Sequence, residues 1–344
     1  PLDAAAAAPA PPPFVLVAAG VVGFVFFQME IVWYRLLSPL LGGNTFTFGV
    51  ILAVALLGIG LRGALYSVLG SRRPATVRAF AWTCTLEAVC LAYPYALGDR
   101  LAITTLQLQA LGSAEFSGLV LSWLLVTMLI AFPASVVAGF QFPLLIGLLG
   151  QGTRDVGRHT GVAYACNTLG AIIGSLAAGF GLLPLIGALG AWRLSVGLLL
   201  VLGVVALALA WRQPQGVGFK LANVGAAVLV VAMLFSVGPT AAWRHSGIGA
   251  GMIDLDHFKN RNDVIDWLHE YRRAIPWQGE GREVCVGIDE QSGYSFMING
   301  KSDGHARKDA CTQVMCGLLG GLLHPNPTRA LVIGLGTGST AGWL

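Results

Sequence analysis

The chain has 344 residues, of which 55% are hydrophobic and 11% are charged, and its mean hydropathy is +0.71. This balance excludes an ordinary soluble globular protein and indicates an integral membrane protein. The formal net charge of +4 is small and shows no basic patch, so no nucleic-acid partner is predicted. The six cysteines are scattered without a CxxC pair, which favours free thiols over a metal site.

Residues 1–13 form an Ala/Pro-rich tract that we expect to be a disordered tether. After it, seven apolar runs are long enough to cross a hydrocarbon core about 30 Å thick as helices. These runs predict a transmembrane helical bundle over residues 14–238, distantly similar to half a major facilitator. The seven runs are Phe14–Leu37, Thr45–Gly70, Ala75–Leu97, Phe116–Leu149, His159–Ile186, Leu189–Trp211 and Gly218–Val237.

Two segments of the bundle depart from a simple crossing. The run Phe116–Leu149 is long enough to overshoot the membrane, and Pro133, Gly139 and Pro143 predict a kink or break within it. The segment 101–113, LAITTLQLQALGS, is too short to cross, so we expect it to lie along the interface or to cap the bundle.

Small residues recur along the fifth run and predict a packing seam. Gly170 and Gly174 are four residues apart, a spacing that lets two helices approach closely in lipid. Asn167 lies beside them and is expected to form an interhelical hydrogen bond, or alternatively to belong to a polar path. The other small residues of this run are Gly161, Ala165, Ala178 and Gly181.

Three ionisable residues, Glu30, Arg62 and Glu87, fall inside or near the ends of the expected spans. An ionised group there costs at least a few kcal/mol unless it has a partner or reaches water. Glu30 could pair with Arg35, or either acid could meet Arg62 across the bundle. The group is interpreted as a structural brace or, alternatively, as a transport or proton path.

Charged residues become frequent after Val237, so residues 239–328 are expected to be a soluble region. An amphipathic helix is predicted in 260–275, with Ile265, Leu268 and Tyr271 on its buried side. Two strands of a β-hairpin are predicted in 282–300, and a further helix in 309–323. On the hairpin, the residues expected to alternate on one face are Val284, Val286 and Ile288.

The last residues, 329–344, contain the sequence VIGLGTGST, which predicts a strand over Arg329–Ile333, a glycine turn and the start of a helix. Gly334, Gly336 and Gly338 would leave backbone N–H groups open to a carboxylate, a ribose or a phosphate. The spacing departs from G-x-G-x-x-G and lacks the Lys and Ser/Thr of a nucleoside-triphosphate loop. An adenosylmethionine-type nucleoside pocket is one interpretation, and a tight turn without ligand is the other.

Several motifs in this order resemble the membrane-fused spermidine synthase family, whose members join a multi-span bundle to an α/β Rossmann-like aminopropyltransferase domain. In the bundle the resemblance rests on EIVWYRLLSPLLGGNTFTFGVILAVALLGIGL, FPASVVAGFQFPLL and GVAYACNTLGAIIGSLAAGFGLLPLIGALG. In the soluble part it rests on MINGKSDG, DACTQVMCGLLGGLLHPNP and LVIGLGTGSTAG.

The resemblance implies transfer of an aminopropyl group from decarboxylated S-adenosylmethionine, as co-substrate, to a diamine such as putrescine. It assigns the nucleoside to Gly334, Gly336, Thr337 and Gly338. Substrate contacts would come from the turn at Asn299 and from Asp303 and Gln313, two positions at which this chain differs from the family pattern. Asp303 stands where soluble synthases usually have glutamine, and Gln313 lies in place of an acidic, tyrosine-containing stretch. These departures leave the acceptor amine open.

In Rossmann-type folds an acid that binds the ribose hydroxyls follows such a glycine loop by about 20 residues. That acid and the catalytic residues of the family are therefore expected beyond Leu344. We expect the given chain to be a catalytically incomplete part of a longer transferase.

Arginines gather at the ends of the expected spans that should face the cytoplasm of a bacterial-type inner membrane. With seven crossings the soluble region would then emerge on the opposite side, away from a cytosolic nucleoside. A different span count at Phe116–Leu149 would remove this conflict. The basic residues concerned are Arg72, Arg73, Arg78, Arg154, Arg158, Arg212 and Lys220.

Two other functions remain open from the sequence. The bundle could transport polyamine-like cations, with Glu30 and Glu87 attracting them. Alternatively the protein could be a non-catalytic membrane subunit. The partners expected across these hypotheses are the lipid bilayer, small polyamine and nucleoside substrates, and a membrane protein or a second copy of the chain.

Overall fold

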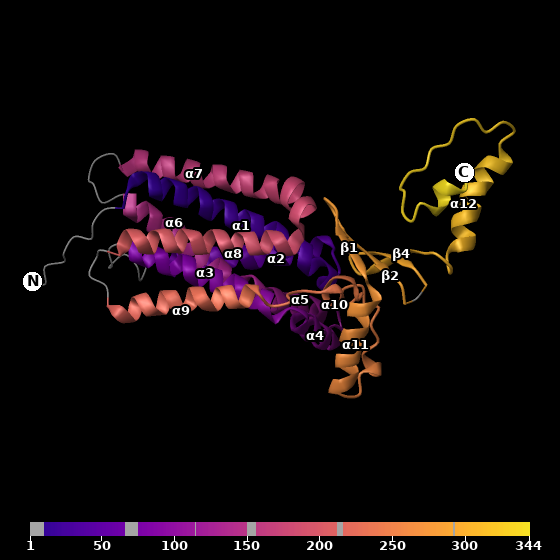
Figure 1. Cartoon of the computed structure of the whole chain (residues 1–344), viewed down its shortest axis with the longest axis horizontal. Coiled ribbons are helices and arrows are strands. Elements are labelled where there is room, and N and C mark those ends of the chain that lie inside the picture. Colours follow the sequence, from indigo (N-terminus) through magenta and orange to yellow (C-terminus); the bar gives the residue numbers. More distant parts are fainter. Residues whose placement is uncertain (1–9, 66–74, 114, 150–155, 212–215, 292) are drawn as a thin grey trace, which may run out of the picture.

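The computed structural model describes residues 10–65, 75–113, 115–149, 156–211, 216–291 and 293–344. Within these ranges the chain is mostly helical, with one small antiparallel sheet. The longest helices lie side by side along the long axis of the molecule, and the sheet lies beyond one end of them (Figure 1). They are α1 (Pro12–Leu41), α2 (Thr45–Leu65), α3 (Val77–Leu97), α6 (Phe132–Leu149), α7 (Val156–Ala177), α8 (Leu183–Ala210) and α9 (Val217–Leu234).

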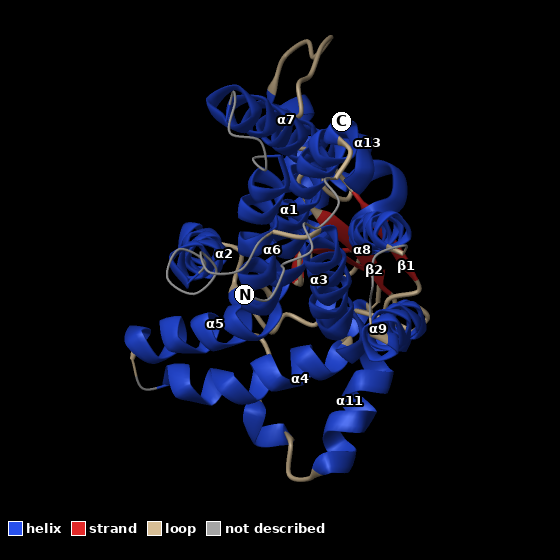
Figure 2. Ribbon diagram, turned by 90° about the vertical axis from the view of Figure 1, so that its left-hand side faces the viewer, coloured by secondary structure: helices blue, strands red, loops and turns tan. Residues whose placement is uncertain are grey.

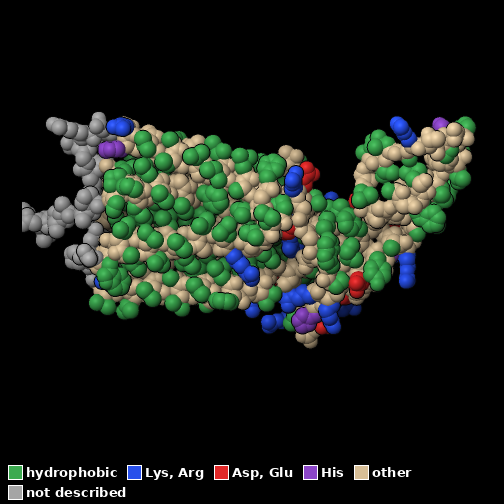
Figure 3. All heavy atoms as spheres, turned by 45° about the horizontal axis from the view of Figure 1, so that its top comes forward, with side chains coloured by type: hydrophobic (Ala, Val, Ile, Leu, Met, Phe, Trp, Pro, Cys, Tyr) green, Lys and Arg blue, Asp and Glu red, His purple; other side chains and the backbone are tan. Residues whose placement is uncertain are grey.

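Four stretches of described helix are long and apolar enough to cross a bilayer, which indicates a membrane protein. Hydrophobic side chains cover much of the bundle surface seen in Figure 3, and charged side chains gather mainly at its ends and on the region beyond. The stretch over 157–210 contains two antiparallel helices, α7 and α8, joined through a π-helical turn, η3 (Ala178–Leu182). The four stretches are Pro12–Leu41, Phe132–Leu149, Gly157–Ala210 and Val217–Leu234.

The start of α1 corrects the expected tether. Helix α1 begins at Pro12, whereas the Ala/Pro tract was predicted to be disordered through residue 13. Proline fits the first turn of a helix because the N–H that it lacks has no intrahelical partner there. Residues 1–9 lie outside the described part of the chain.

The expected run Phe116–Leu149 is interrupted beside Pro133, as predicted, and forms two helices. Helix α5 (Phe116–Ile130) ends at Ala131, and α6 starts with Pro133 in its first turn. Figure 2 looks along the long axis of the bundle, so α6 points toward the viewer. Helix α5 is seen from the side in this view, which means that it lies across the end of the bundle. It packs there against α4 (Asp99–Leu108) and the 3-10 turn η2 (Gln109–Ser113), which confirms the predicted cap.

The predicted small-residue seam joins α1 and α7. A Cβ atom built on Gly170 would lie 1.9 Å from the carbonyl oxygen of Gly20. Another built on Gly174 would lie 2.3 Å from the carbonyl oxygen of Phe24. The Asn167 side-chain amide donates to the carbonyl of Ala19 at 2.9 Å, so Asn167 is the interhelical hydrogen bonder. The two backbones touch because neither glycine carries a side chain.

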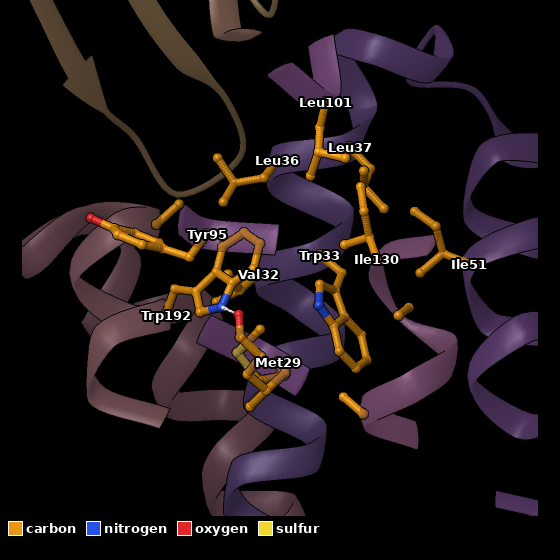
Figure 4. Packing of buried hydrophobic residues seen from close by; sticks show 14 of the residues in the cluster. Met29, Val32, Trp33, Leu36, Leu37, Ile51, Tyr95, Leu101, Ile130 and Trp192 are labelled. Atoms are coloured by element: carbon orange, nitrogen blue, oxygen red, sulfur yellow. Dashed lines mark hydrogen bonds between the residues drawn. The ribbon is translucent and has the colours of Figure 1, made fainter. Parts of the chain in front are cut away.

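Large apolar side chains fill the centre of the bundle where α1, α3, α5 and α8 meet (Figure 4). Trp33 and Trp192 are fully buried, and the Trp192 indole donates to the carbonyl of Leu91 at 3.0 Å. Tyr95 packs edge-on against Trp192 with ring centroids 5.8 Å apart. Edge-on aromatic pairs of this kind stabilise a core beyond the area that they bury.

The predicted amphipathic helix is α11 (Arg261–Ala274). It begins with a capping box, in which the Asn260 side chain accepts from the amide of Asp263 and the Asp263 carboxylate accepts from the amide of Asn260. The expected buried face is partly wrong, because Ile265 is exposed and Trp267 is buried. Trp267 packs edge-on against Phe258 and at a tilt against Tyr271, so the buried face of the helix is the one that carries this aromatic cluster.

The predicted hairpin is confirmed as β2 (Cys285–Asp289) and β3 (Ser295–Ile298) of a four-stranded sheet. The sheet is antiparallel in the order β1-β2-β3-β4, with outer strands β1 (Trp277–Glu280) and β4 (Lys301–His305). The buried face of β2 carries Cys285 and Gly287 rather than Val284, Val286 and Ile288. These small residues admit a neighbour, because a Cβ on Gly287 would lie 3.1 Å from the His245 ring.

The region after α9 does not separate cleanly from the bundle. Helix α10 (Ala241–His245) is buried along its length at the end of α1. The Trp243 indole donates to the carbonyl of Leu36 at 2.5 Å. The helix predicted over 309–323 is α12 (Ala310–Leu323), which lies farther from the bundle. The four-residue helix α13 (Ser339–Gly342) packs on it.

The break at Ala131 does not change the side on which the chain leaves the bundle. Helix α5 lies across the end, and α6 alone runs back along the long axis (Figure 1). Helices α3, α7 and α9 all start at the end opposite the sheet, which places Arg78, Arg158 and Lys220 there. These basic residues and the soluble region therefore lie at opposite ends of the bundle, as the count of seven crossings predicts. Arg72, Arg73, Arg154 and Arg212 lie outside the described residues.

Candidate functional site

The glycine loop between residues 334 and 338 is open to solvent. Gly334, Gly336 and Gly338 have φ values of 83°, 53° and 77°, a region that favours glycine. A Cβ built on any of them would meet no atom within 4 Å. The amides of Gly336 and Thr337 donate no hydrogen bond within the described part of the chain. The backbone is thus uncovered on the side where a ligand could approach.

Two of the predicted site residues, Thr337 and Gln313, are in contact at this loop. The Thr337 hydroxyl donates to the side-chain oxygen of Gln313 on α12 at 2.8 Å. A Cβ on Gly304 of β4 would lie 2.7 Å from the Thr337 methyl group and 2.9 Å from the Gln313 amide nitrogen. The loop, α12 and the end of the sheet therefore meet at one place.

Asp303 immediately precedes this meeting point. Phe296 pairs with Gly304 and Met297 pairs with Ser302, which leaves Asp303 as the extra residue of a β-bulge. Bulges re-aim a side chain and are common beside functional sites. The Asp303 side chain is exposed.

Asn299 does not join the glycine loop. It occupies the turn between β3 and β4 with a φ of 47°, and its side chain accepts from the amide of Cys285 at 3.0 Å. Asn299 precedes Gly304 by five residues, which corresponds to about 16 Å along an extended strand. The structure therefore gives Asn299 a role in shaping the hairpin.

The strand predicted over Arg329–Ile333 is absent, which corrects the expected Rossmann start. Leu331 and Ile333 are 85% and 92% exposed, and no described strand lies beside them. A strand is stabilised by pairing and by burial of one face, and this segment has neither. Only the glycine turn and the short helix α13 form as predicted.

The ionisable residues of the bundle do not pair as expected. Glu87 is buried between α3 and α6 and accepts from the Gln141 side chain at 2.5 Å, so its partner is an amide rather than a cation. Glu30 is half-buried and forms no ion pair with a described residue. The side chain of Arg62 lies outside the described residues.

Arg35 pairs with an acid that the sequence did not suggest. Its guanidinium donates to the Glu280 carboxylate at 3.0 Å, to the carbonyl of Gly281 at 2.9 Å and to the carbonyl of Arg282 at 2.5 Å. Arg244 of α10 forms a second ion pair with Glu280. The amide of Ala188, freed where Gly187 interrupts α8, lies 3.4 Å from the same carboxylate.

This network, which we call the Glu280 junction, consists of Glu280, Arg35 and Arg244. All three side chains are at most 9% exposed. They come from β1, α1 and α10, so the junction holds the sheet to the end of the bundle. A second link joins Asp99 of α4 to Arg272 of α11, with N–O distances of 3.0 and 2.9 Å.

His245 lies beside the junction in a buried site. Its Nε2 is 3.4 Å from the Cys285 sulfur, and both side chains are almost fully buried. Burial, with a contribution from the Arg244 charge, lowers the pKa of His245 to about 4, and a hydrogen bond with Gln278 opposes this shift. The imidazole is therefore neutral at physiological pH.

We expect acid to destabilise the protein through His245. The unfolded chain binds a proton near pH 6.5, whereas the folded imidazole stays neutral down to about pH 4. The unfolded state holds the extra proton in this window, so the free energy of unfolding falls by about 2 kcal/mol between pH 7 and pH 5. Chemical unfolding in detergent at several pH values measures this loss.

Two variants isolate the contribution of His245. His245→Gln should flatten the pH dependence, and His324→Gln, which changes an exposed histidine, should leave it as in the wild type. An equal slope in all three proteins would show that His245 does not titrate in this window.

Among the described residues, no group of three or more His, Cys, Asp or Glu side chains is arranged to hold a metal ion. Comparison of the chain with models of protein families, with curated proteins and with solved structures finds no match. The candidate site is therefore argued from its own geometry.

Proposed function

We propose that the protein is a membrane-anchored transferase that binds the nucleoside of decarboxylated S-adenosylmethionine on the loop around Gly336. The observation that carries this proposal is a loop with Gly334, Gly336 and Gly338 at positive φ, in which the amides of Gly336 and Thr337 donate to no described residue. Free N–H groups on such a loop suit ribose hydroxyls or other oxygen atoms of a ligand. The resemblance to the fused spermidine synthases supplies the choice of ligand.

The chemistry would be nucleophilic displacement at carbon. The neutral amine of a diamine attacks the methylene carbon that is bonded to the sulfonium sulfur. The C–N bond forms as the C–S bond breaks, and the electron pair of that bond neutralises sulfur to give methylthioadenosine. The proton of the new ammonium passes to a carboxylate acting as base. The task of the protein is to position the two substrates.

Asp303 supports a cationic acceptor. Its carboxylate is exposed at the bulge next to Gly304, and Gly304 is in contact with Thr337 of the glycine loop. An acid at that place attracts an ammonium group toward a nucleoside held on the loop. We assign Asp303 to the acceptor amine and Gln313 to holding the loop through Thr337.

The same proposal places the protein in a bacterial-type inner membrane as a multi-pass protein with the lipid bilayer as its solvent. It is supported by the four membrane-length helical stretches. The small polyamine and the nucleoside are its proposed substrates, and assembly with a second copy or another membrane protein remains compatible with it.

Calorimetric titration with methylthioadenosine tests the nucleoside site. The wild type should bind, and Gly336→Val should bind at least about tenfold more weakly, because a β-branched residue at positive φ distorts the loop at a cost of about 1–3 kcal/mol. Asp303→Asn should leave this binding unchanged, since its proposed partner is the amine.

Gly251→Val is the matched control. Gly251 also has positive φ, 66°, and no atom within 4 Å of a built Cβ, but it lies outside the loop. Wild-type binding in Gly251→Val with loss in Gly336→Val supports the site. No binding to the wild type, or equal binding by all variants, would remove the nucleoside assignment.

A further inference from the structure

An apolar groove opens on the side of the bundle between α8 and α9, with α3 as its floor. Its volume is about 580 Å³. The lining is aliphatic except for one polar pair at the base. Residues that line the walls include Leu200, Val204 and Leu207 of α8 and Ala227, Val228 and Val231 of α9.

The polar pair at the base is satisfied within the protein. The Thr85 hydroxyl lies 3.3 Å from the side-chain oxygen of Asn223, and both residues are at most 5% exposed. The Asn223 amide donates to the carbonyl of Phe219 at 3.2 Å. Because these groups already have partners, the groove favours hydrocarbon over a polar solute.

One end of the groove leads to two cations that lie over aromatic rings. The Arg78 guanidinium carbon is 4.4 Å from the centroid of the Phe219 ring, and the Lys220 nitrogen is 4.1 Å from the centroid of the Trp211 ring. Trp82 packs against Phe219 with centroids 6.2 Å apart. Neither cation forms an ion pair with a described residue.

Sequence spacing connects this basic cluster to the groove. Asn223 follows Lys220 by about one helical turn, and Leu207 precedes Trp211 by about one turn. Arg78 precedes Thr85 on α3 by two turns, about 10 Å. The cations therefore lie beyond the mouth of the groove, at the starts of α3 and α9, where basic and aromatic residues meet lipid headgroups.

We propose that this groove and the basic cluster form a binding site for an anionic phospholipid. One of its acyl chains lies in the groove between α8 and α9, and its phosphate lies between Arg78 and Lys220. Charge complementarity selects the anionic headgroup.

The site has a structural consequence for α9. Only 11% of the apolar window of this helix is buried, and α9 packs mainly on α3. A lipid in the groove would bridge α9 to α8. Helix α9 is followed directly by α10, which carries Arg244 of the Glu280 junction. By holding α9 in place, the lipid would stabilise the connection between the bundle and the sheet.

Native mass spectrometry of the detergent-purified protein tests the proposal. The protein is incubated with equal amounts of phosphatidylglycerol and phosphatidylcholine that have matched acyl chains and distinguishable masses. Phosphatidylglycerol adducts should exceed phosphatidylcholine adducts at least fivefold. Arg78→Gln combined with Lys220→Gln should abolish this preference, and Ala227→Phe, which fills the groove, should reduce phosphatidylglycerol retention at least fivefold.

Matched controls separate the site from general effects of charge and size. Arg100→Gln combined with Arg193→Gln removes two exposed arginines at the other end of the bundle, one of which lies over the Tyr95 ring. Ala222→Phe enlarges an exposed residue of α9 outside the groove. Both controls should behave as the wild type. Equal retention of the two lipids by the wild type, or no difference between a variant and its control, would overturn the proposal.

Discussion

Replacing Glu280 by glutamine should loosen the sheet from the helix bundle. The carboxylate is the only acid at the junction among the described residues, and it faces two buried arginines. Glutamine is nearly the same size but carries no charge, so Arg35 and Arg244 would be left as uncompensated buried cations. Breaking a buried ion pair in this way costs about 3–5 kcal/mol.

The loss should appear first as local opening of β1 and β2. Hydrogen–deuterium exchange of the detergent-purified protein measures it at the amides of these strands. A cost of about 3–5 kcal/mol corresponds to exchange at least about 100-fold faster. Helix α7 and the part of α1 that packs on it, around Gly20 and Phe24, should exchange as in the wild type, because this contact lies outside the junction.

Glu283→Gln is the control for this experiment. It removes the same charge three residues later from an exposed position that forms no ion pair with a described residue. Exposed charges of this kind contribute less than about 1 kcal/mol. If β1 and β2 exchange equally in the two variants, the junction does not hold the sheet to the bundle.

The junction also shows why part of the structure could not be read from the sequence. Arg35 and Glu280 are 245 residues apart, and no local spacing predicts such a pair. The sequence suggested Glu30, five residues from Arg35, because that acid is near in the chain. Arg35 pairs with Glu280 because the tertiary fold buries the Arg35 side chain beside β1 and α10, and this burial cannot be inferred from the local sequence.

Features that depend on local chemistry were predictable. The apolar runs predicted the long helices, the amphipathic pattern in 260–275 predicted α11, and the alternation over residues 284–288 predicted the hairpin. Val284, Val286 and Ile288 do share one face, but the fully buried face carries Cys285 and Gly287, which are small enough to pack against His245.

The glycine loop was predictable in conformation but not in its surroundings. Three glycines at alternate positions adopt positive φ as expected. The strand before them does not form, since apolar residues such as Ile333 become a strand only beside another strand that they can pair with and cover. The bulge that exposes Asp303 arises from β3–β4 pairing and leaves no signature in the sequence.

Gly170→Ala should destabilise the bundle although alanine is the better helix former. A Cβ at this position would lie 1.9 Å from the Gly20 carbonyl oxygen and 2.7 Å from its carbonyl carbon. Both are backbone atoms, so α1 and α7 must move apart. Overpacking of this kind costs about 1–3 kcal/mol or more, which exceeds the helix-propensity gain of about 1 kcal/mol.

The separation would also lengthen the hydrogen bond from Asn167 to the Ala19 carbonyl, which lies in the same contact. The free energy of unfolding in detergent, measured by denaturant titration, should therefore fall by about 1–3 kcal/mol. Adding Gly174→Ala, whose Cβ would meet the Phe24 backbone, should lower it further.

Gly161→Ala provides the opposite expectation on the same helix. No atom lies within 4 Å of a Cβ built there, so only the propensity gain remains, and stability should stay level or rise by up to about 1 kcal/mol. The two substitutions are chemically identical and differ only in what the new methyl group meets. Equal effects would mean that α1 and α7 are not in backbone contact through Gly170, and the small-residue spacing would then reflect composition rather than packing.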